Sequence, residues 1–273
     1  MSAVAVCSSG GVLGRANQDA AYAMLARTTV GDVGMAVVCD GVGGLACGEK
    51  ASATVAHAFY NWFQNELSGL VAKRRQLDFD AVQSRWATVL KSLNNMLYKR
   101  GSHGDVPMGT TFTGLLACSG TCMVGHVGDS RAYKILGNGE EQLTEDQTLE
   151  AYLQQHGHAN ADESSGQAEG HAILQAVGAA SALEPVFSCG TFAPQDAFVL
   201  CTDGAYRTLE NGDLIRTFSY QKILEESALQ EACDSLVQAC INRGECDNIT
   251  VACIGPQPCQ DSSLTIAVGG ERP

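Results

Sequence analysis

Five aspartates in this sequence lie in short stretches with turn-forming residues, most of them beside an apolar run, and their side chains are the ones best suited to chemistry. Asp40 ends the run A-V-V-C-D and is followed by G-V-G-G, and Asp203 ends F-V-L-C-T-D in the same way. Asp247 precedes the run I-T-V-A-C-I, Asp129 lies in the turn G-D-S-R, and Asp19 closes R-A-N-Q-D. If these strand ends meet at one edge of a sheet, several carboxylates converge in one cleft.

Carboxylates that converge in a partly desolvated cleft repel one another, so they take up protons or bind a cation. The set contains neither His nor Cys, and carboxylate and carbonyl oxygens favour Mg²⁺ or Mn²⁺ over Zn²⁺. Two such ions about 3.5–4 Å apart could share one carboxylate and a bridging water, and could activate that water to attack a phosphorus or carbonyl centre. The residues alone therefore favour metal-assisted hydrolysis.

Each stretch taken by itself has a plainer explanation. A single Asp-Gly or Asp-Asn is more often a turn than a ligand, because Asx side chains bind local backbone groups. Asp129 alone would be a hairpin turn, and Arg15 alone a solvated surface charge. The G-V-G-G after Asp40 lacks the Gly-Lys-Ser/Thr of a P-loop and the full spacing of a dinucleotide fingerprint. Only the joint pattern favours a metal site.

The elements that would position these residues form an α+β pattern. Tight turns between apolar runs predict antiparallel neighbours, and long amphipathic helices inserted between strands do not fit an alternating βαβ array. Residues 156–171 are small and polar, which is typical of a surface loop. The predicted strands are residues 3–7, 34–40, 111–118, 123–127, 131–136, 196–202 and 249–254, and the predicted helices are 49–67, 79–98 and 227–241.

Composition narrows the class of protein. The 273 residues carry a formal net charge of −13, which disfavours binding to nucleic acid or to an anionic membrane. The twelve cysteines contain no C-x-x-C pair, so neither a zinc site nor a disulfide framework is indicated. The chain shows no signal peptide, no membrane span and no heptad seam. A cytoplasmic monomer is the expectation.

Eight motifs, in their order, resemble the metal-dependent serine/threonine protein phosphatases of type 2C, and most closely the compact stand-alone bacterial type. The resemblance covers roughly residues 8–254. It implies a β-sandwich of two antiparallel sheets flanked by α-helices, with a variable flap at about 147–171 beside the metal site. It also implies one catalytic domain over residues 1–256 and a peripheral tail over 257–273. The motifs are R-A-N-Q-D, D-G-V-G-G, M-G-T-T, V-G-D-S-R, L-T-E-D-Q-T, L-Q-A-V-G, C-T-D-G and D-N-I-T.

The resemblance implies a role for each predicted ligand. Asp40 matches the carboxylate that bridges two tightly bound Mn²⁺ or Mg²⁺ ions. Gly41 matches the residue whose backbone carbonyl binds the second metal, and Asp203 and Asp247 match the remaining direct ligands of the first. Asp19 matches an acidic residue that holds metal-bound water.

Two further positions match residues that act on the substrate or on an extra ion. Arg15 matches the guanidinium that grips the substrate phosphate, a role that suits its planar pair of donors. Asp129, together with Asp203, matches the pair that holds a third, weaker metal in bacterial relatives.

The sequence departs from the family pattern at three positions. Val42 stands where many eukaryotic members have a His proposed to protonate the leaving group, so the general acid is unassigned. His126 is a poor substitute, because a His inside an apolar run is more often packed and hydrogen-bonded. Gln147 stands where His is common, and Gln18 where Glu is common; neither change removes a predicted ligand.

The resulting hypothesis is an enzyme that hydrolyses phosphoserine and phosphothreonine in phosphorylated proteins, by attack of a water bridging two divalent metals. The enzyme would oppose a bacterial serine/threonine kinase. The alternative is a catalytically inactive regulatory module that binds a phosphoprotein or a kinase. Such a module would be expected to lose Asp40, Asp203, Asp247 or Arg15, and the sequence retains all four.

Overall fold

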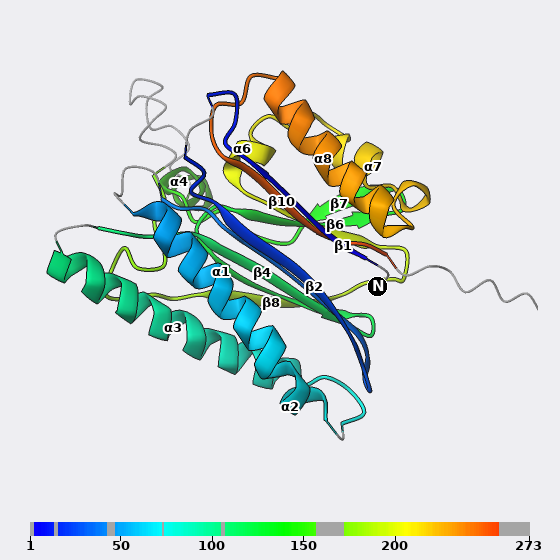
Figure 1. The fold of residues 1–273 in the computed structure, drawn as a ribbon, viewed down its shortest axis with the longest axis horizontal. Coiled ribbons are helices and arrows are strands. Elements are labelled where there is room, and N and C mark those ends of the chain that lie inside the picture. The colour runs from blue at the N-terminus through cyan, green and yellow to red at the C-terminus, as the bar shows by residue number, and fades with distance from the viewer. Residues whose placement is uncertain are drawn as a thin grey trace, which may run out of the picture.

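Two antiparallel five-stranded sheets form the centre of the protein (Figure 1). The computed structural model describes residues 3–13, 16–42, 47–72, 74–104, 107–156 and 172–256. Sheet A has the strand order β1 (Val4–Ser9), β10 (Ile249–Ile254), β9 (Ala197–Cys201), β6 (Arg131–Leu136) and β7 (Gly139–Gln142). Sheet B has the order β2 (Ala20–Thr28), β3 (Gly31–Cys39), β4 (Phe112–Cys118), β5 (Thr121–Val127) and β8 (Val186–Thr191).

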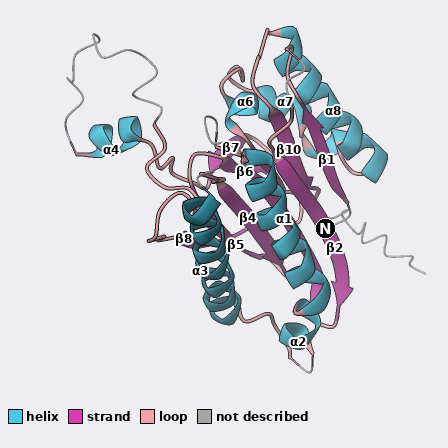
Figure 2. Ribbon diagram, turned by 60° about the vertical axis from the view of Figure 1, so that its left-hand side comes forward, coloured by secondary structure: helices cyan, strands magenta, loops and turns pink. Residues whose placement is uncertain are grey.

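Helices cover the outer face of each sheet, so the molecule has four layers (Figures 1 and 2). Sheet B is covered by α1 (Gly48–Asn65) and α3 (Phe79–Gly104), with the short α2 (Leu67–Val71) following α1. Sheet A is covered by α8 (Glu226–Asn242), with α6 (Asp203–Tyr206) and α7 (Asp213–Thr217) beside it. The remaining elements are α4 (Leu149–Gln155) and a 3₁₀ turn at Tyr220–Lys222.

The central strands are apolar throughout because both of their faces are buried. In β3, Val37 and Cys39 pack under the helices, whereas Ala36 and Val38 pack against sheet A. Strand β9 of sheet A is also buried on both faces: Phe198 packs between the two sheets, and its neighbours in the strand pack under α8. A half-exposed strand would alternate apolar and polar residues, and these strands do not.

An aromatic cluster joins the helices to sheet B. Trp86 of α3 meets Phe59 of α1 edge-on, with ring centroids 5.0 Å apart, and meets Phe112 of β4 at 6.1 Å. Gly114 makes room for this cluster, because a Cβ there would lie 2.7 Å from the Phe112 ring and 3.1 Å from Trp86. The position therefore requires the absence of a side chain rather than an unusual backbone conformation.

The predicted fold class is confirmed: a β-sandwich of two antiparallel sheets flanked by helices. Every predicted strand and helix is present, with ends shifted by a few residues, and the expected helix at 49–67 divides near Glu66 into α1 and α2. Three strands, β2, β7 and β8, were not predicted. Most of the expected loop and the whole of the expected tail lie outside the described residues. Within the described ranges no helix is long and apolar enough to cross a membrane.

Candidate metal centre

Strand pairing brings the ends that carry the five aspartates to one edge of the sandwich. In sheet B, Ala20 at the start of β2 pairs with Cys39 at the end of β3, so the neighbouring Asp19 and Asp40 lie at the same edge of the sheet. Phe112 pairs with Val127 at that edge, just before the turn that holds Asp129. In sheet A, Cys201 pairs with both Val251 and Arg131, which places the segments of Asp203 and Asp247 at the corresponding edge. The convergence follows from antiparallel register.

The M-G-T-T motif holds the backbone of Asp40 in place. The Asp40 N–H donates to Thr111 Oγ1 at 2.9 Å. Its carbonyl accepts from Thr110 Oγ1 and from the Thr111 N–H, each at 2.8 Å. Thr111 Oγ1 also lies 2.8 Å from Ser130 Oγ, next to Asp129. Because the backbone of Asp40 is hydrogen-bonded through both its N–H and its carbonyl, the point from which its side chain projects is fixed at the edge of the sandwich.

Each predicted Asp-Gly pair uses glycine because another backbone segment passes close by. A Cβ on Gly41 would lie 2.6 Å from the carbonyl carbon of Gly48 and 2.8 Å from the carbonyl oxygen of Gln18. A Cβ on Gly204 would collide with the carbonyl oxygen of Asn248. The glycines thus allow the segments that carry the aspartates to meet.

Thr202 joins three of the motifs. Its Oγ1 donates to Asp19 Oδ2 at 2.9 Å and accepts from the Thr250 N–H at 3.0 Å. A second link runs from the Gln18 N–H to Asn248 Oδ1, at 2.9 Å. R-A-N-Q-D, C-T-D-G and D-N-I-T are therefore held together by hydrogen bonds that involve residues next to the predicted ligands.

Asp129 lies in the turn between β5 and β6 and is 2% exposed. The preceding Gly128 has φ of +104°, and Gln147 fixes it from two sides. Gln147 Oε1 accepts from the Gly128 N–H at 2.9 Å, and the Gln147 N–H donates to the Gly128 carbonyl at 2.8 Å. Gln147 thus supports the turn that holds Asp129.

Arg207 faces two of the predicted ligands. Its Nη2 lies 2.7 Å from Asp203 Oδ2, and its Nη1 lies 3.8 Å from Asp247 Oδ2. Asp203 is 8% exposed, whereas the side chain of Asp247 is 55% exposed and accepts the Asn248 N–H at Oδ1. Arg207 thus links the more exposed Asp247 to the buried Asp203.

Burial makes ionisation of these carboxyl groups unfavourable. It raises the pKa of Asp40 well above its ordinary value, and the charges of Asp19 and Asp203 raise it further. Burial and then the charge of Asp203 raise the pKa of Asp129 to about 7. The pKa of Asp203 is also raised by burial, although Arg207 opposes the shift. A cluster of this kind is stabilised by protons or by added positive charge.

The residues fit a divalent cation. The buried Oδ1 atoms of Asp19, Asp129 and Asp203 accept no hydrogen bond from the described residues. Carboxylate oxygens without His or Cys suit Mg²⁺ or Mn²⁺. In the described part of the chain, however, no three acidic, His or Cys side chains are already close enough together to form a metal shell. Because Asp203 and Asp247 are turned toward Arg207, binding a metal requires side-chain rotation.

Arg131 connects the centre to the base of the flap. Its guanidinium binds the Asp146 carboxylate through two nitrogens, at 2.9 and 2.7 Å, and lies 3.7 Å above the ring of Tyr206. Tyr206 belongs to the helical turn that begins at Asp203. One side chain therefore ties V-G-D-S-R, L-T-E-D-Q-T and the C-T-D-G turn together.

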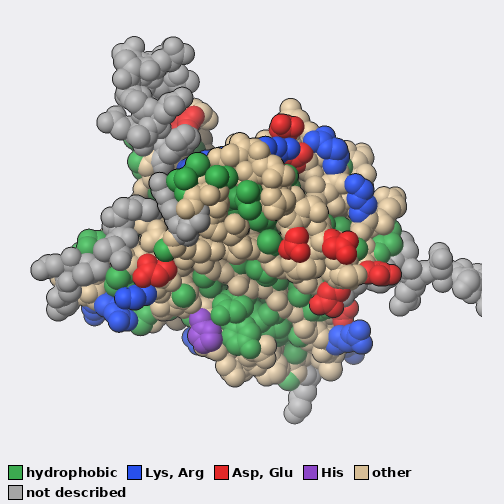
Figure 3. All heavy atoms as spheres, turned by 45° about the horizontal axis from the view of Figure 1, so that its top comes forward, with side chains coloured by type: hydrophobic (Ala, Val, Ile, Leu, Met, Phe, Trp, Pro, Cys, Tyr) green, Lys and Arg blue, Asp and Glu red, His purple; other side chains and the backbone are tan. Residues whose placement is uncertain are grey.

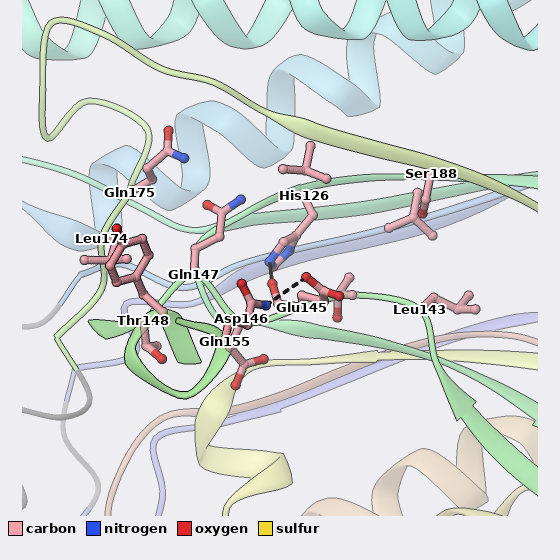
Figure 4. A pocket seen from close by; sticks show the side chains of 14 residues that line it. His126, Leu143, Glu145, Asp146, Gln147, Thr148, Gln155, Leu174, Gln175 and Ser188 are labelled. Atoms are coloured by element: carbon pink, nitrogen blue, oxygen red, sulfur yellow. Dashed lines mark hydrogen bonds between the residues drawn. The ribbon is translucent and has the colours of Figure 1, made fainter. Parts of the chain in front are cut away.

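A cavity of about 450 Å³ lies at the base of the flap, and none of the five aspartates lines it (Figure 4). His126 lines it but is only 3% exposed. Its Nε2 donates to the Glu145 carbonyl at 3.0 Å, and its Nδ1 lies 2.9 Å from Thr113 Oγ1. Burial lowers the pKa of His126 to about 4. This histidine is packed and neutral, as its apolar context predicted.

The structure brings Asp19, Asp40, Asp129 and Asp203 together, with Asp247 at their margin. Arg15 lies outside the described residues. Sequence reasoning gave no role to Thr202, Asn248 or Arg207. Arg207 could have been found, since an Arg four residues after an Asp on a helical turn is a common ion pair.

Comparison with known proteins then decides the family. The family model described as Protein phosphatase 2C matches residues 12–239. This chain belongs to the protein phosphatase 2C family. It is accordingly a metal-dependent protein phosphatase, a hydrolase of phosphoric monoesters.

Bacterial protein phosphatases are among the relatives of this chain. A putative protein phosphatase 2C-type of Streptococcus pyogenes serotype M6 is 27% identical over 194 residues, which cover 70% of this chain and 75% of the relative. Serine/threonine protein phosphatase PstP of Mycobacterium tuberculosis H37Rv is 29% identical over 222 residues, 81% of this chain but 39% of PstP. This chain therefore spans about two fifths of PstP.

Solved structures agree with the fold of the protein phosphatase 2C family. Serine/threonine phosphatase Stp1 of Staphylococcus aureus superposes with a TM-score of 0.75 at 22% identity, covering 94% of this chain and 96% of Stp1. The catalytic domain of PstP in complex with 2 manganese ions gives a TM-score of 0.71 at 24% identity, covering 93% of this chain and 98% of that domain. At these identities the comparison shows the β-sandwich and helices alone.

Proposed function

We propose that this phosphatase hydrolyses phosphoserine and phosphothreonine monoesters of proteins with two Mn²⁺ or Mg²⁺ ions held by Asp40, Asp203 and Asp247. The observation that carries the proposal is the gathering, at one edge of the sandwich, of buried carboxylate oxygens that have no hydrogen-bond partner among the described residues. The substrate class is supported by relatives such as the serine/threonine phosphatase stp of Listeria innocua, which is 23% identical over 194 residues. Phosphorylated proteins are then its substrates.

Each residue of the proposed centre has its own role in binding the metal ions, the water or the phosphate group. Bound metal ions would neutralise the phosphate charge and activate a water for in-line attack. Asp40 would be a ligand of both ions, and the carbonyl of Gly41 would be a ligand of the second. Asp19, whose Oδ2 is fixed by Thr202 and whose Oδ1 is buried with no hydrogen-bond partner among the described residues, would orient a water at the centre. Arg15 grips two phosphate oxygens through its planar guanidinium.

The proton that the leaving alkoxide needs does not come from His126. Both ring nitrogens of His126 are engaged, and burial lowers its pKa to about 4. Val42, at the position that carries His in many eukaryotic relatives, cannot titrate. We infer that solvent at the metal centre supplies the proton.

A weaker ion position is assigned to Asp129 together with Asp203. Both carry a buried Oδ1 without a hydrogen-bond donor among the described residues. The buried place of Asp129, and the effect of the Asp203 charge on its pKa, support a shared cation.

The cellular setting is part of the same proposal. A single catalytic domain over residues 1–256 acts as a monomer in the cytoplasm against the products of a serine/threonine kinase. The cysteines of the described residues are all free thiols, which supports a reducing compartment. The alternative, an inactive binding module, has no observation in its favour, since all the aspartates of the metal centre are retained.

The substitution Asp40→Asn tests the assignment. Removing the bridging charge should lower kcat on p-nitrophenyl phosphate by about 10²-fold or more. The same change should raise the thermal stability of the metal-free protein, because burial and neighbouring carboxylates make the charge of Asp40 unfavourable. The exposed Asp80, in the first turn of α3, supplies the control Asp80→Asn, which should leave both properties unchanged. Normal turnover in a folded Asp40→Asn protein would refute the ligand role.

A further inference from the structure

The cavity at the base of the flap has an apolar wall that the fold leaves open to solvent (Figure 4). Its floor is the buried Val124 of β5, which packs in the layer between the two sheets together with Leu143. Leu174 and Val186 line the same cavity and are 50% and 54% exposed. A volume of about 450 Å³ gives room for a long side chain of another molecule.

Backbone hydrogen bonds fix the polar wall of the cavity. The Glu145 carbonyl accepts from His126 Nε2 at 3.0 Å, which holds the segment 143–148 against β5. The Gln147 carbonyl accepts from the Leu174 N–H at 2.7 Å, which joins the polar wall to the apolar one. The cavity is therefore formed before any ligand binds, and little conformational entropy is lost when it is filled.

The cavity carries one negative charge that no cation balances. Two carboxylates line it, and no Lys or Arg is among the described residues that do so. Asp146 is neutralised by Arg131, which binds it through two nitrogens. Glu145 is exposed and pairs with no cation in the described part of the chain; its Oε2 accepts only from the neutral amide of Gln155, at 3.2 Å. Glu145 thus offers a carboxylate beside an apolar wall.

Two residues that line the cavity also contact the turn of the proposed metal centre. Gln147 exchanges two backbone-directed hydrogen bonds with Gly128, which precedes Asp129. Asp146 is bound to Arg131, two residues after Asp129. The cavity and the metal centre therefore share these supports, and a polypeptide whose phosphate group reaches the centre passes beside the cavity.

We propose that this cavity binds the side chain of a lysine or arginine next to the phosphorylated residue of a protein substrate. The methylene stem lies along Leu174 and Val186, and the cationic head lies at the carboxylate of Glu145. The proposal rests on the proposed function. A long side chain that ends in a positive charge matches both walls, since its stem buries apolar surface while its head keeps a polar partner. A purely apolar side chain leaves Glu145 without a cation, and an acidic one is repelled.

A set of phosphothreonine peptides tests the proposal. One lysine is moved through each position on either side of the phosphothreonine in an alanine-rich peptide, and each peptide has a partner with norleucine, which is lysine without its amino group. With Mn²⁺ present, lysine should raise kcat/KM about threefold to fivefold over norleucine at one position. The gain should lie in KM with kcat unchanged, because the cavity binds substrate away from the reacting atoms. A preference for lysine at every position would indicate general attraction to an acidic protein and would overturn the proposal.

Substitutions of Glu145 locate the preference. In Glu145→Gln the ratio of kcat/KM for the lysine peptide to that for the norleucine peptide should fall to about 1, and Glu145→Lys should favour glutamate at the same position. Each ratio is measured within one variant, so the amount of active enzyme cancels. Glu231→Gln removes an equal charge from the exposed surface of α8 and should keep the wild-type ratio. An unchanged ratio in Glu145→Gln would contradict the role of Glu145.

Leu174→Ser tests the apolar wall. It should raise KM about twofold or more for the lysine and norleucine peptides alike, because both stems lose the same contact. No change in either KM would overturn binding in the cavity.

The peptide series also separates this proposal from the proposed function. Equal kcat/KM for lysine and norleucine at all positions would overturn the basic-residue site and leave a working phosphatase. A folded, Mn²⁺-loaded wild type that hydrolyses neither the peptides nor p-nitrophenyl phosphate would refute the proposed function, and this proposal with it.

Discussion

Asp19 shows how a single carboxylate is held ready at this centre. Burial raises its pKa to about 6, and hydrogen bonds from Thr250 and Thr202 oppose the shift. Oδ2 has a donor in Thr202, whereas Oδ1 has none among the described residues. The same division recurs at Asp203, whose Oδ2 pairs with Arg207 while its Oδ1 has no partner among the described residues. At the residue scale, each of these two carboxylates is held through Oδ2, while its buried Oδ1 has no hydrogen-bond donor among the described residues.

Thr202→Val tests the support given to Asp19. The substitution keeps the shape but removes the donor to Asp19 Oδ2 and the acceptor of the Thr250 N–H. Because buried polar groups then lose their partners, the free energy of unfolding should fall by about 1–3 kcal/mol, measured by urea denaturation. The exposed Thr88, which donates to a helix carbonyl, gives the control Thr88→Val, with an expected change within about 0.5 kcal/mol. Equal effects of the two changes would contradict this role of Thr202.

His126 makes a prediction about pH. Its folded pKa is about 4, below the ordinary value of 6.5, because burial disfavours the charged ring. Between these values the unfolded chain binds more protons than the folded one, so the folded state loses stability as pH falls from 6.5 to 4. Relative to His126→Gln, the wild type should lose up to about 3 kcal/mol over this range. A stability difference between the two proteins that stays constant with pH would show that His126 is not buried in neutral form.

At the element scale, the central strands were predictable from sequence and three of the edge strands were not. Strands β3, β9 and β10 are buried on both faces and read as apolar runs. Strands β2, β7 and β8 lie at sheet edges, where β7 reads G-E-E-Q and β8 is mostly exposed. The alanine-rich β2 has no strand signal of its own and is specified by its pairing with β3.

In the candidate site too, local sequence patterns were predictable and contacts between distant segments were not. Four of the aspartates could be singled out because they lie at the ends of apolar runs or in the turn between two of them, whereas Asp19 precedes the unpredicted β2 and was singled out by its turn residues and the motif R-A-N-Q-D. The hydrogen bond from Thr202 to Asp19 and the contact of Arg207 with Asp247 join residues that are distant in sequence or depend on tertiary position. Such contacts are set by how the two sheets meet, so no local pattern predicts them.

Packing between α3 and sheet B can be tested at Gly114. In Gly114→Ala the new Cβ would lie 2.7 Å from the Phe112 ring and 3.1 Å from Trp86, so the free energy of unfolding should fall by about 1–3 kcal/mol. A Cβ on Gly69 in α2 would meet no atom within 4 Å, and Gly69→Ala should leave stability unchanged or raise it by up to about 1 kcal/mol. Urea denaturation measures both, and a neutral Gly114→Ala would contradict the tight fit.

At the scale of the whole molecule, two sheets with helices on their outer faces form four layers, and the aspartates proposed for the metal centre lie at one edge of the sandwich. The helices cover the outer faces of the sheets (Figure 2). Four of the aspartates lie beside an end of β2, β3, β9 or β10, and Asp129 lies between β5 and β6. On the face shown in Figure 3, acidic and basic side chains are interspersed. With a net charge of −13, the chain has no general attraction for polyanions, so binding of a phosphate group depends on local positive charge at the centre.

Metal-dependent turnover can be measured directly, as hydrolysis of a phosphothreonine peptide by the purified wild-type protein, first with added Mn²⁺ and then with excess chelator. We predict turnover with Mn²⁺, its loss with chelator, and its return when Mn²⁺ is restored, because the carboxylate cluster needs divalent cations to act on a phosphate. Undiminished turnover in chelator, or no turnover by folded, Mn²⁺-loaded protein, would contradict the metal-dependent phosphatase mechanism.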